Sequence, residues 1–244
     1  NGFLPDLAAL AAGVTPDVRA IALVSPNNPT GAVYPPDMLG AIYDLCVARG
    51  IWLILDETYR DFLPAGAGRP HDLFERAGWE DTLIGLYSFS KSFCIPGHRL
   101  GAITAGNAVV TQVAKIMDNL QICPPRSAQA AVATAIPLLA EWREENRREI
   151  ARRVEALRAT MAAAPDWRVG AVGAYFAFIG HPFAGTPSAA VAERLAKEAG
   201  ILCLPGSYFG PGQEGYLRFA FANADVETIA KLGGRLASFV MDGA

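Results

Sequence analysis

The sequence predicts an α/β protein with a mostly parallel β-sheet, followed by a smaller C-terminal α+β domain. In the first half, short and continuously apolar runs alternate with a helical pattern, as in parallel strands that are buried on both faces. A long, highly charged helical stretch follows, and beyond Pro165 strand-like and helix-like segments are mixed. We therefore expect a large domain over residues 1–140 and a small domain over residues 141–244 that is entered through the long helix.

Four apolar segments are the predicted strands of the large domain. A helical pattern over Asp37–Arg49, which Gly50 ends, separates the first two of them. Strands separated by helices favour a parallel sheet with right-handed crossovers. The predicted strands are Ala20–Val24, Ile51–Leu55, Thr82–Tyr87 and Leu100–Ala105.

The second half begins with a helical pattern over residues 127–164, which we expect Pro137 to kink or split. Residues 141–158 carry six arginines and five glutamates, and Glu149 and Arg153 are four residues apart. Such a run forms either a binding surface or a solvated helix face with ion pairs, and the spacing favours the second. The small-domain strands are predicted at Tyr175–Ile179 and Tyr216–Phe221, and its helices at Pro187–Gly200 and Asp225–Phe239.

Composition excludes several classes of protein. The 244 residues are 52% hydrophobic and 18% charged with a net charge of −3, so neither nucleic acid nor an acidic membrane surface is an expected partner. The apolar runs are too short or too interrupted to cross a membrane. The four cysteines form no CxxC pair and the three histidines are scattered, so we expect no metal site and a cytoplasmic protein with reduced thiols.

Lys91 is the most informative residue of the chain. The other three lysines, Lys115, Lys197 and Lys231, lie in amphipathic helical patterns, where a lysine is usually a solvated charge. Lys91 instead follows an apolar strand, among serines and aromatic residues and eight positions before Arg99. An amine in such surroundings, close to another cation, loses affinity for its proton and becomes a nucleophile that can hold an aldehyde as a Schiff base.

Polar clusters follow three of the predicted strands. They are Ser25–Gly31, Asp56–Tyr59 and Ser88–Lys91. Ligands of open α/β sheets bind outside the carboxyl ends of the strands, so these clusters are expected at one edge of the sheet.

The side chains of these clusters suit pyridoxal phosphate. This cofactor needs an amine for its aldehyde, an acid beside its pyridine nitrogen, hydrogen bonds to its ring hydroxyl, and donors with a cation for its phosphate. The candidates are Lys91 for the aldehyde and Asp56 for the pyridine nitrogen. Asn28 and Tyr59 suit the ring hydroxyl, and Ser88, Ser90 and Arg99 suit the phosphate.

Four motifs together resemble the class I/II pyridoxal-phosphate aminotransferases of fold type I, which are similar to aspartate aminotransferase. The motifs occur in family order: Ser25–Gly31, Asp56–Tyr59, Ser88–Lys91 with Pro96–Gly101, and Tyr216–Ala220. The resemblance implies a cofactor-binding large domain with helices on both faces of its sheet, and a homodimer with an α-amino acid and a 2-oxo acid as substrates.

The resemblance also implies a role for each candidate residue. Lys91 would form the Schiff base and carry the proton between the substrate and the cofactor, and Asp56 would pair with the pyridine nitrogen. Arg218 would bind the substrate α-carboxylate through its planar fork. Asn28 and Tyr59 would hold the ring oxygen, and Ser88, Ser90 and Arg99 would hold the phosphate. Asn28 would also support the contact between Arg218 and the carboxylate.

Other interpretations of single residues stay open. Asp56 can be a helix N-cap, Tyr59 a packing residue and Arg99 a member of a structural ion pair. Glu57, beside the cofactor acid, receives no role. Residues 173–176 and 205–210 are either substrate-side loops of the family or turns that lead into core strands.

The chain departs from the family at its beginning. Residues 1–19 alone precede the first predicted strand. The resemblance implies a long upstream stretch with a glycine-rich phosphate loop and an aromatic residue that stacks on the cofactor. We therefore expect the C-terminal part of an aminotransferase, inactive or self-associating when produced alone. The alternatives are a catalytically incompetent fragment, or another reaction of this fold type such as β-elimination (a C–S lyase) or decarboxylation.

Overall fold

The computed structural model describes residues 2–64 and 66–241, which form two compact units. Of the described residues, the N-terminal unit comprises 4–26 and 33–146, and the C-terminal unit comprises 2–3, 27–32 and 147–241. The two units interleave along the chain because residues 27–32, which follow the first strand, pack in the C-terminal unit. The domain limits at residues 140 and 141 remain a prediction.

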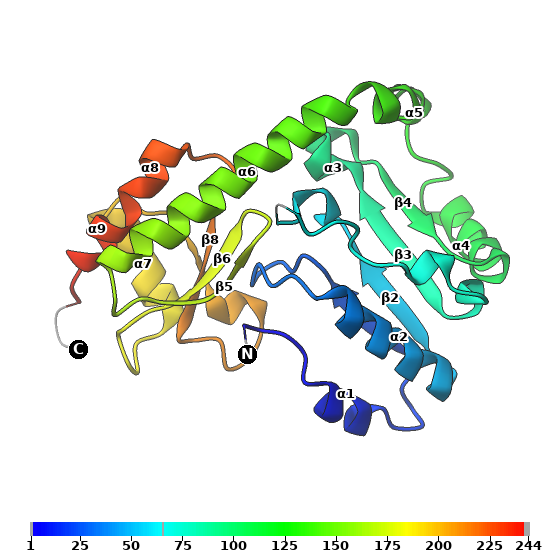
Figure 1. Cartoon of the computed structure of the whole chain (residues 1–244), viewed down its shortest axis with the longest axis horizontal. Helices are drawn as coiled ribbons and strands as arrows, with labels where there is room; N and C mark the ends of the chain where they lie inside the picture. Colours follow the sequence, from blue (N-terminus) through cyan, green and yellow to red (C-terminus); the bar gives the residue numbers. More distant parts are fainter. Residues whose placement is uncertain (1, 65, 242–244) are drawn as a thin grey trace. The chain divides into compact units, whose positions relative to one another are not determined.

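The N-terminal unit contains a four-stranded sheet in the order β1-β2-β3-β4 (Figure 1). Its strands are β1 (Ala20–Val24), β2 (Trp52–Asp56), β3 (Leu83–Ser88) and β4 (Gly101–Thr104). The first three are parallel, as predicted, whereas β4 runs antiparallel to β3. Residues 89–100 between β3 and β4 form only the four-residue helix α3 (Phe89–Ser92) and a 3₁₀ turn at Pro96–His98, whereas the crossover between parallel strands is usually a longer α-helix.

The helices of the N-terminal unit are α1 (Leu7–Gly13), α2 (Pro36–Arg49), α3 (Phe89–Ser92), α4 (Asn107–Leu120) and α5 (Arg126–Leu138). Helix α2 packs against β2 through a buried face that includes Leu39, Ile42 and Cys46. It ends at Gly50, whose φ of 62° lies in the left-handed region. In the part of the chain that the structure describes, no helix is long and apolar enough to cross a membrane.

Pro137 divides the long helical pattern, as predicted. It lies in the last turn of α5, and α6 (Ala140–Thr160) begins after Leu139. The charged run on α6 forms ion pairs, with Arg153 Nε 2.8 Å from Glu149 Oε1. The interpretation of this run as a helix face with ion pairs therefore agrees with the structure.

The C-terminal unit contains a second, antiparallel sheet in the order β5-β6-β8-β7. Two of its strands, β6 and β8, lie where the sequence predicted strands. The others escaped prediction because one is glycine-rich and the other has only two residues. The four strands are β5 (Arg168–Gly173), β6 (Phe176–Gly180), β7 (Leu204–Pro205) and β8 (Tyr216–Ala220).

Alternation along β6 and β8 gives this sheet two different faces. Ala177, Ile179 and Leu217 belong to the buried core, together with Leu157 of α6 and Leu195 of α7 (Ser188–Glu198). The neighbouring residues Phe176, Phe178 and Arg218 point to the opposite face. Arg218 therefore lies on the face of the sheet opposite the one that packs against this core.

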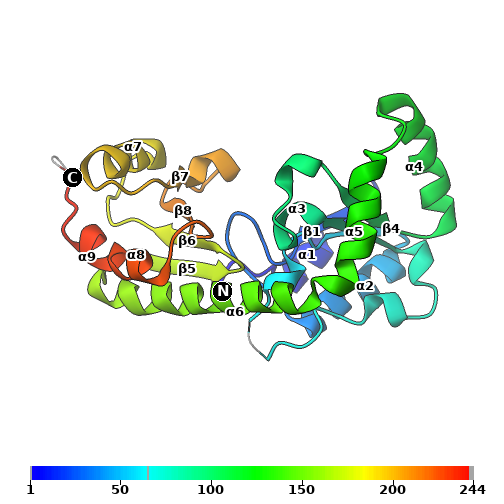
Figure 2. The same cartoon turned by 90° about the horizontal axis from the view of Figure 1, so that it is seen from above.

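Two short helices, α8 (Val226–Ala230) and α9 (Leu232–Ala237), lie beside the end of α6 (Figure 2). The sequence predicted one helix over Asp225–Phe239. The division is accompanied by contacts with Thr160 of α6. The Thr160 hydroxyl donates to the Ala230 carbonyl at 2.7 Å and accepts from the Gly233 N–H at 3.0 Å.

Candidate functional site

The carboxyl ends of β1, β2 and β3 meet at one edge of the N-terminal sheet. The register pairs Val24 with Asp56 and Asp56 with Leu86, so Asp56 and Ser88 end neighbouring strands at that edge. The structure thus brings six of the predicted site residues into the N-terminal unit: Asp56, Tyr59, Ser88, Ser90, Lys91 and Arg99. Asn28 and Arg218 come together in the C-terminal unit.

Asp56 is held with one carboxylate oxygen engaged. Its Oδ1 accepts a hydrogen bond from the Thr58 N–H at 2.9 Å, and its carbonyl accepts from the Ser25 N–H at 3.0 Å. Among the described residues, nothing donates to Oδ2. Asp56 is not the N-cap of a helix, because the next helical turn begins at Arg60 with Tyr59 before it. The second oxygen can therefore serve a ligand, which fits a pyridinium N–H.

Tyr59 is buried, with 6% of its surface exposed. Burial fits the interpretation as a packing residue and fits a phenol that lines a closed site equally well. Its role toward a cofactor therefore stays a prediction.

Glu57, which received no role from the sequence, is a buried anchor. Its Oε1 lies 3.1 Å from His71 Nε2, and these two side chains are 4% and 2% exposed. His71 Nδ1 accepts from the Leu73 N–H at 3.1 Å, which leaves Nε2 as the ring nitrogen beside the carboxylate. Arg60 approaches the other oxygen at 3.4 Å. This contact ties the turn after β2 to the segment around residue 71.

Lys91 lies on the short helix α3, directly after β3. The Ser88 hydroxyl caps this helix by accepting from the Ser90 N–H at 3.3 Å, and Ser90 itself is buried. The Lys91 carbonyl accepts from the Cys94 N–H at 3.1 Å, which closes the turn. Among the residues that the structure describes, the Lys91 amine has no ion-pair partner. An amine at the end of a strand without a carboxylate beside it fits attachment of an aldehyde.

Arg99 lies in the loop before β4. It has a φ of 52°, is exposed, and donates through Nη1 to the Pro96 carbonyl at 2.9 Å. The described residues offer it no ion pair, so the structural alternative considered for Arg99 is not observed. Its guanidinium can therefore serve a phosphate at the same edge as Ser88, because Ser88 pairs with Gly101 at the start of β4.

Arg218 and Asn28 form a polar pair within the C-terminal unit. Arg218 Nη1 donates to Asn28 Oδ1 at 2.7 Å. The guanidinium carbon lies 5.1 Å from the ring centre of Phe176 and 4.8 Å from that of Phe209. Two aromatic rings and one amide thus hold the orientation of a planar fork, which suits bidentate recognition of a carboxylate.

Phe176 and Phe209 were not among the predicted site residues. They come from the two segments, residues 173–176 and 205–210, whose role the sequence left open. An aromatic residue in each segment was visible in the sequence. Their common contact with Arg218 is visible only in the structure, because it depends on how the strand of Arg218 lies between the two segments.

Gly31 positions the Asn28 segment. The segment folds back on itself, since the Gly31 N–H donates to the Asn27 carbonyl at 2.8 Å. Gly31 has a φ of 77°, and a Cβ atom there would lie 2.4 Å from the Phe176 carbonyl oxygen and 2.6 Å from the Gly173 nitrogen. Only glycine permits this approach of the segment to the hairpin of β5 and β6.

We expect Gly31→Ala to destabilise the protein more than Gly50→Ala. Both glycines have a positive φ, but a Cβ at Gly50 meets nothing within 4 Å. Gly50→Ala should cost about 1 kcal/mol from the backbone conformation. Gly31→Ala should cost about 1–3 kcal/mol more from the collision. Urea unfolding measures both values, and equal losses would show that the close approach does not matter.

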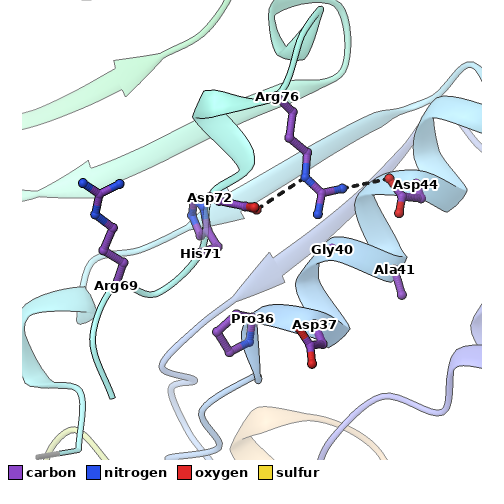
Figure 3. A pocket seen from close by; sticks show the side chains of 9 residues that line it. All are labelled: Pro36, Asp37, Gly40, Ala41, Asp44, Arg69, His71, Asp72 and Arg76. Atoms are coloured by element: carbon purple, nitrogen blue, oxygen red, sulfur yellow. Dashed lines mark hydrogen bonds and ion pairs between the residues drawn. The ribbon is translucent and has the colours of Figure 1, made fainter. Parts of the chain in front are cut away.

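A cavity of about 480 Å³ lies beside α2, but it contains none of the predicted site residues (Figure 3). Its cations are already neutralised. Arg76 lies 2.8 Å from Asp44 and 3.4 Å from Asp72, and Arg69 pairs with Glu75. We therefore assign the polar residues of this cavity to the attachment of α2 to the loop beyond β2.

The sequence matches the protein family described as aminotransferase class I and II over residues 1–236. Among curated proteins, it is 32% identical over 226 residues to the aromatic-amino-acid aminotransferase 2 of Thermococcus litoralis. The match covers 92% of this chain and 58% of that protein. It is also 30% identical to the aspartate/prephenate aminotransferase of Thermus thermophilus, covering 96% of this chain and 62% of that protein. The chain thus spans less than two thirds of the relatives it matches.

Solved structures agree with this similarity. An aromatic aminotransferase from Pyrococcus horikoshii superposes with a TM-score of 0.87 at 30% identity, over 97% of this chain and 63% of that one. The aspartate aminotransferase of Thermus thermophilus with maleate superposes with a TM-score of 0.83 at 28% identity, over 97% of this chain and 60% of that one. The predicted fold class is confirmed.

Proposed function

Because the chain belongs to the class I and II aminotransferase family, whose members use pyridoxal phosphate, we propose that it carries the catalytic lysine and the carboxylate-binding arginine of an aminotransferase. The reaction would move an amino group between an α-amino acid and a 2-oxo acid. The observation that carries this proposal is the placement of the Lys91 amine and the Asp56 carboxylate after neighbouring parallel strands.

The residues of the N-terminal unit have properties that suit the cofactor. Lys91 would hold its aldehyde carbon, and Asp56 would offer its second oxygen to the pyridine nitrogen. Tyr59 would donate to the ring oxygen. Ser88, Ser90 and Arg99 would hold the phosphate. When bound, pyridoxal phosphate supplies an electron sink for chemistry at the substrate α-carbon.

The protein's own work in the reaction is orientation and proton transfer. The Lys91 amine would carry a proton between the substrate α-carbon and the cofactor. Arg218 would fix the α-carboxylate through two parallel hydrogen bonds, and Asn28 already occupies one of its Nη groups. This division assigns chemistry to the N-terminal unit and carboxylate recognition to the C-terminal unit.

We leave the substrate at the level of its class. The names of the relatives refer to aromatic amino acids, to aspartate or prephenate, and to arginine with pyruvate, which differ in their side chains. All α-amino acids share the carboxylate that Arg218 would bind. The proposal also includes a homodimer, as the resemblance implies, and a cytoplasmic location, which the four free cysteines support.

Chemical labelling of Lys91 tests the proposal. We expect borohydride reduction of the cofactor-loaded protein to attach the label to the Lys91 peptide, and not to the exposed Lys115, Lys197 or Lys231. In a separate experiment, incubation of the unreduced, cofactor-loaded protein with an amino acid should release a 2-oxo acid and leave pyridoxamine phosphate. Lys91→Arg, which keeps the charge, should lose both results. A label on another lysine would sink the proposal, and release of a decarboxylated or eliminated product would assign a different reaction.

A further inference from the structure

The turn that carries Lys91 is too short to define its own geometry. Helix α3 has four residues, and a single helical turn in isolation is marginal. It is followed by Cys94, whose φ of 55° is in the left-handed region. The position of the amine therefore depends on what holds the two ends of the turn.

One side of the turn packs on an apolar cluster. Phe89, the first residue of α3, packs with Leu100 and with Ala128 and Val132 of α5. The Phe89 N–H also donates to the Leu100 carbonyl at 3.1 Å. This packing fixes the base of the turn but does not reach Phe93 at its other end.

A polar network centred on Asp61 spans the other side. Tyr87, just before the turn, donates its hydroxyl to Asp61 Oδ2 at 2.5 Å. Asp61 Oδ1 lies 3.4 Å from Arg143 Nη1, near the start of α6. The Arg143 guanidinium carbon lies 5.0 Å from the ring centre of Phe93, just after the turn. All four residues belong to the N-terminal unit, where α3 and the start of α6 are neighbours (Figure 1).

The protonation of Tyr87 helps to keep this network in place at neutral pH. Burial raises the pKa of Tyr87, and its hydrogen bond to Asp61 raises that pKa further. The phenol therefore remains a donor to Asp61. Asp61 and Arg143 have side chains that are only 25% and 24% exposed, so water competes weakly for this contact.

Aromatic rings complete the connection across the turn. The rings of Tyr87 and Phe89 are 5.1 Å apart in an edge-to-face arrangement, and those of Phe89 and Phe93 are 5.6 Å apart. Movement of Phe93 therefore displaces the rings on which the turn rests. The Asp61 network and the ring contacts hold both ends of the turn at once.

We propose that Asp61, Tyr87 and Arg143 are positioning residues that fix the Lys91 turn. Asp61 contacts both Tyr87, just before the turn, and Arg143, whose guanidinium lies over the ring of Phe93 just after the turn. This inference rests on the proposed role of Lys91. The three residues act through the geometry of the turn and do not touch the reacting atoms. Asp61 and Arg143 carry opposite charges, so the pair adds no net charge near the site.

The opposite charges allow positioning to be separated from an electrostatic effect. The test uses the holoenzyme with Asp61→Asn, Tyr87→Phe and Arg143→Leu, and with Arg143→Lys as a variant that keeps the charge. The readouts are the rate of cofactor loss to a carbonyl-trapping reagent, the pH midpoint of the cofactor absorbance, and the unfolding midpoint of the apoprotein. Arg152→Leu on the same helix is the control, because Arg152 is 72% exposed and pairs only locally with Glu149.

We expect each of the three main variants to lose cofactor about threefold to tenfold faster, which corresponds to loss of one partly buried hydrogen bond or ion pair. The pH midpoint of the cofactor absorbance should move in the same direction in all three variants. Arg143→Lys should lose cofactor more slowly than Arg143→Leu. The double variant Asp61→Asn/Tyr87→Phe should be no worse than the stronger single variant, because both remove the same contact. The control should match the unaltered protein.

Two results would overturn the inference. A lower unfolding midpoint with an unchanged rate of cofactor loss and unchanged absorbance would mean that the network serves only the fold. Opposite shifts for Asp61→Asn and Arg143→Leu, with no effect of Tyr87→Phe, would mean that charge acts on the site directly. Borohydride labelling is done in parallel. A label away from Lys91 refutes the proposed function as well. If the label is on Lys91, a negative result refutes only the positioning role of Asp61, Tyr87 and Arg143.

Discussion

Asp56→Asn is expected to slow the reaction of the bound cofactor with amino acid by about a thousandfold, on the order of 4 kcal/mol in the activation free energy. The variant keeps the size of the side chain and the Oδ1 acceptor that holds the Thr58 N–H. It removes the negative charge that keeps a pyridine nitrogen protonated. Folding should therefore survive while the electron sink is lost. Single-turnover kinetics with an amino acid measures the effect.

The matched control for this prediction is Asp37→Asn. Asp37 is an exposed carboxylate in the first turn of α2, so its loss changes the net charge equally without reaching the strand ends. This variant should react at the rate of the unaltered protein. Near-native turnover of Asp56→Asn would contradict the assignment of Asp56 to the cofactor ring.

Arg218→Lys is expected to lower kcat/KM for an amino acid by about a hundredfold while the cofactor absorbance persists. The lysine keeps the positive charge but cannot present two parallel N–H groups to a carboxylate. It also loses the planar surface that lies between the rings of Phe176 and Phe209. The decarboxylated amine analogue, which has no carboxylate, should react as slowly with the variant as with the unaltered protein.

Arg168→Lys is the control for this second prediction. Arg168 also lies over an aromatic ring of the same sheet, that of Tyr216 at 5.6 Å, but it is exposed at the start of β5. The same exchange there should leave kcat/KM unchanged. Equal losses for the amino acid and the amine would remove Arg218 from the role of carboxylate receptor.

The grouping of candidate site residues in the N-terminal unit was predictable from the sequence because these residues follow the ends of strands. The strands β1, β2 and β3 are short apolar runs, and parallel pairing brings their carboxyl ends to one edge whatever the details of packing. Asp56, Ser88 and Lys91 stand at those ends, so their neighbourhood could be inferred without coordinates. The direction of β4 was not predictable in this way, because it depends on the path of residues 89–100, which include α3 and a 3₁₀ turn.

Contacts between side chains that are distant in sequence could not be predicted from apolar patterns. The approach of Arg143 to Asp61 spans 82 positions and was not predicted, and that of Arg218 to Asn28, which spans 190, was implied only by the family resemblance. Neither pair shares a strand end or a helical spacing that a pattern could reveal. The role of Glu57 was hidden for the same reason, since its partner His71 lies in a loop without periodicity.

The sequence by itself determined the family and most of the elements, and it predicted which groups would react, because motifs and apolar periodicity are local properties of the chain. The tertiary structure alone decided how those groups are held. It placed residues 27–32 on the C-terminal sheet, where Gly31 permits close contact, and it put two phenylalanines against Arg218. It also surrounded the Lys91 turn with an apolar cluster and the Asp61 network. These features depend on packing between distant segments, and packing is settled only when the whole core forms.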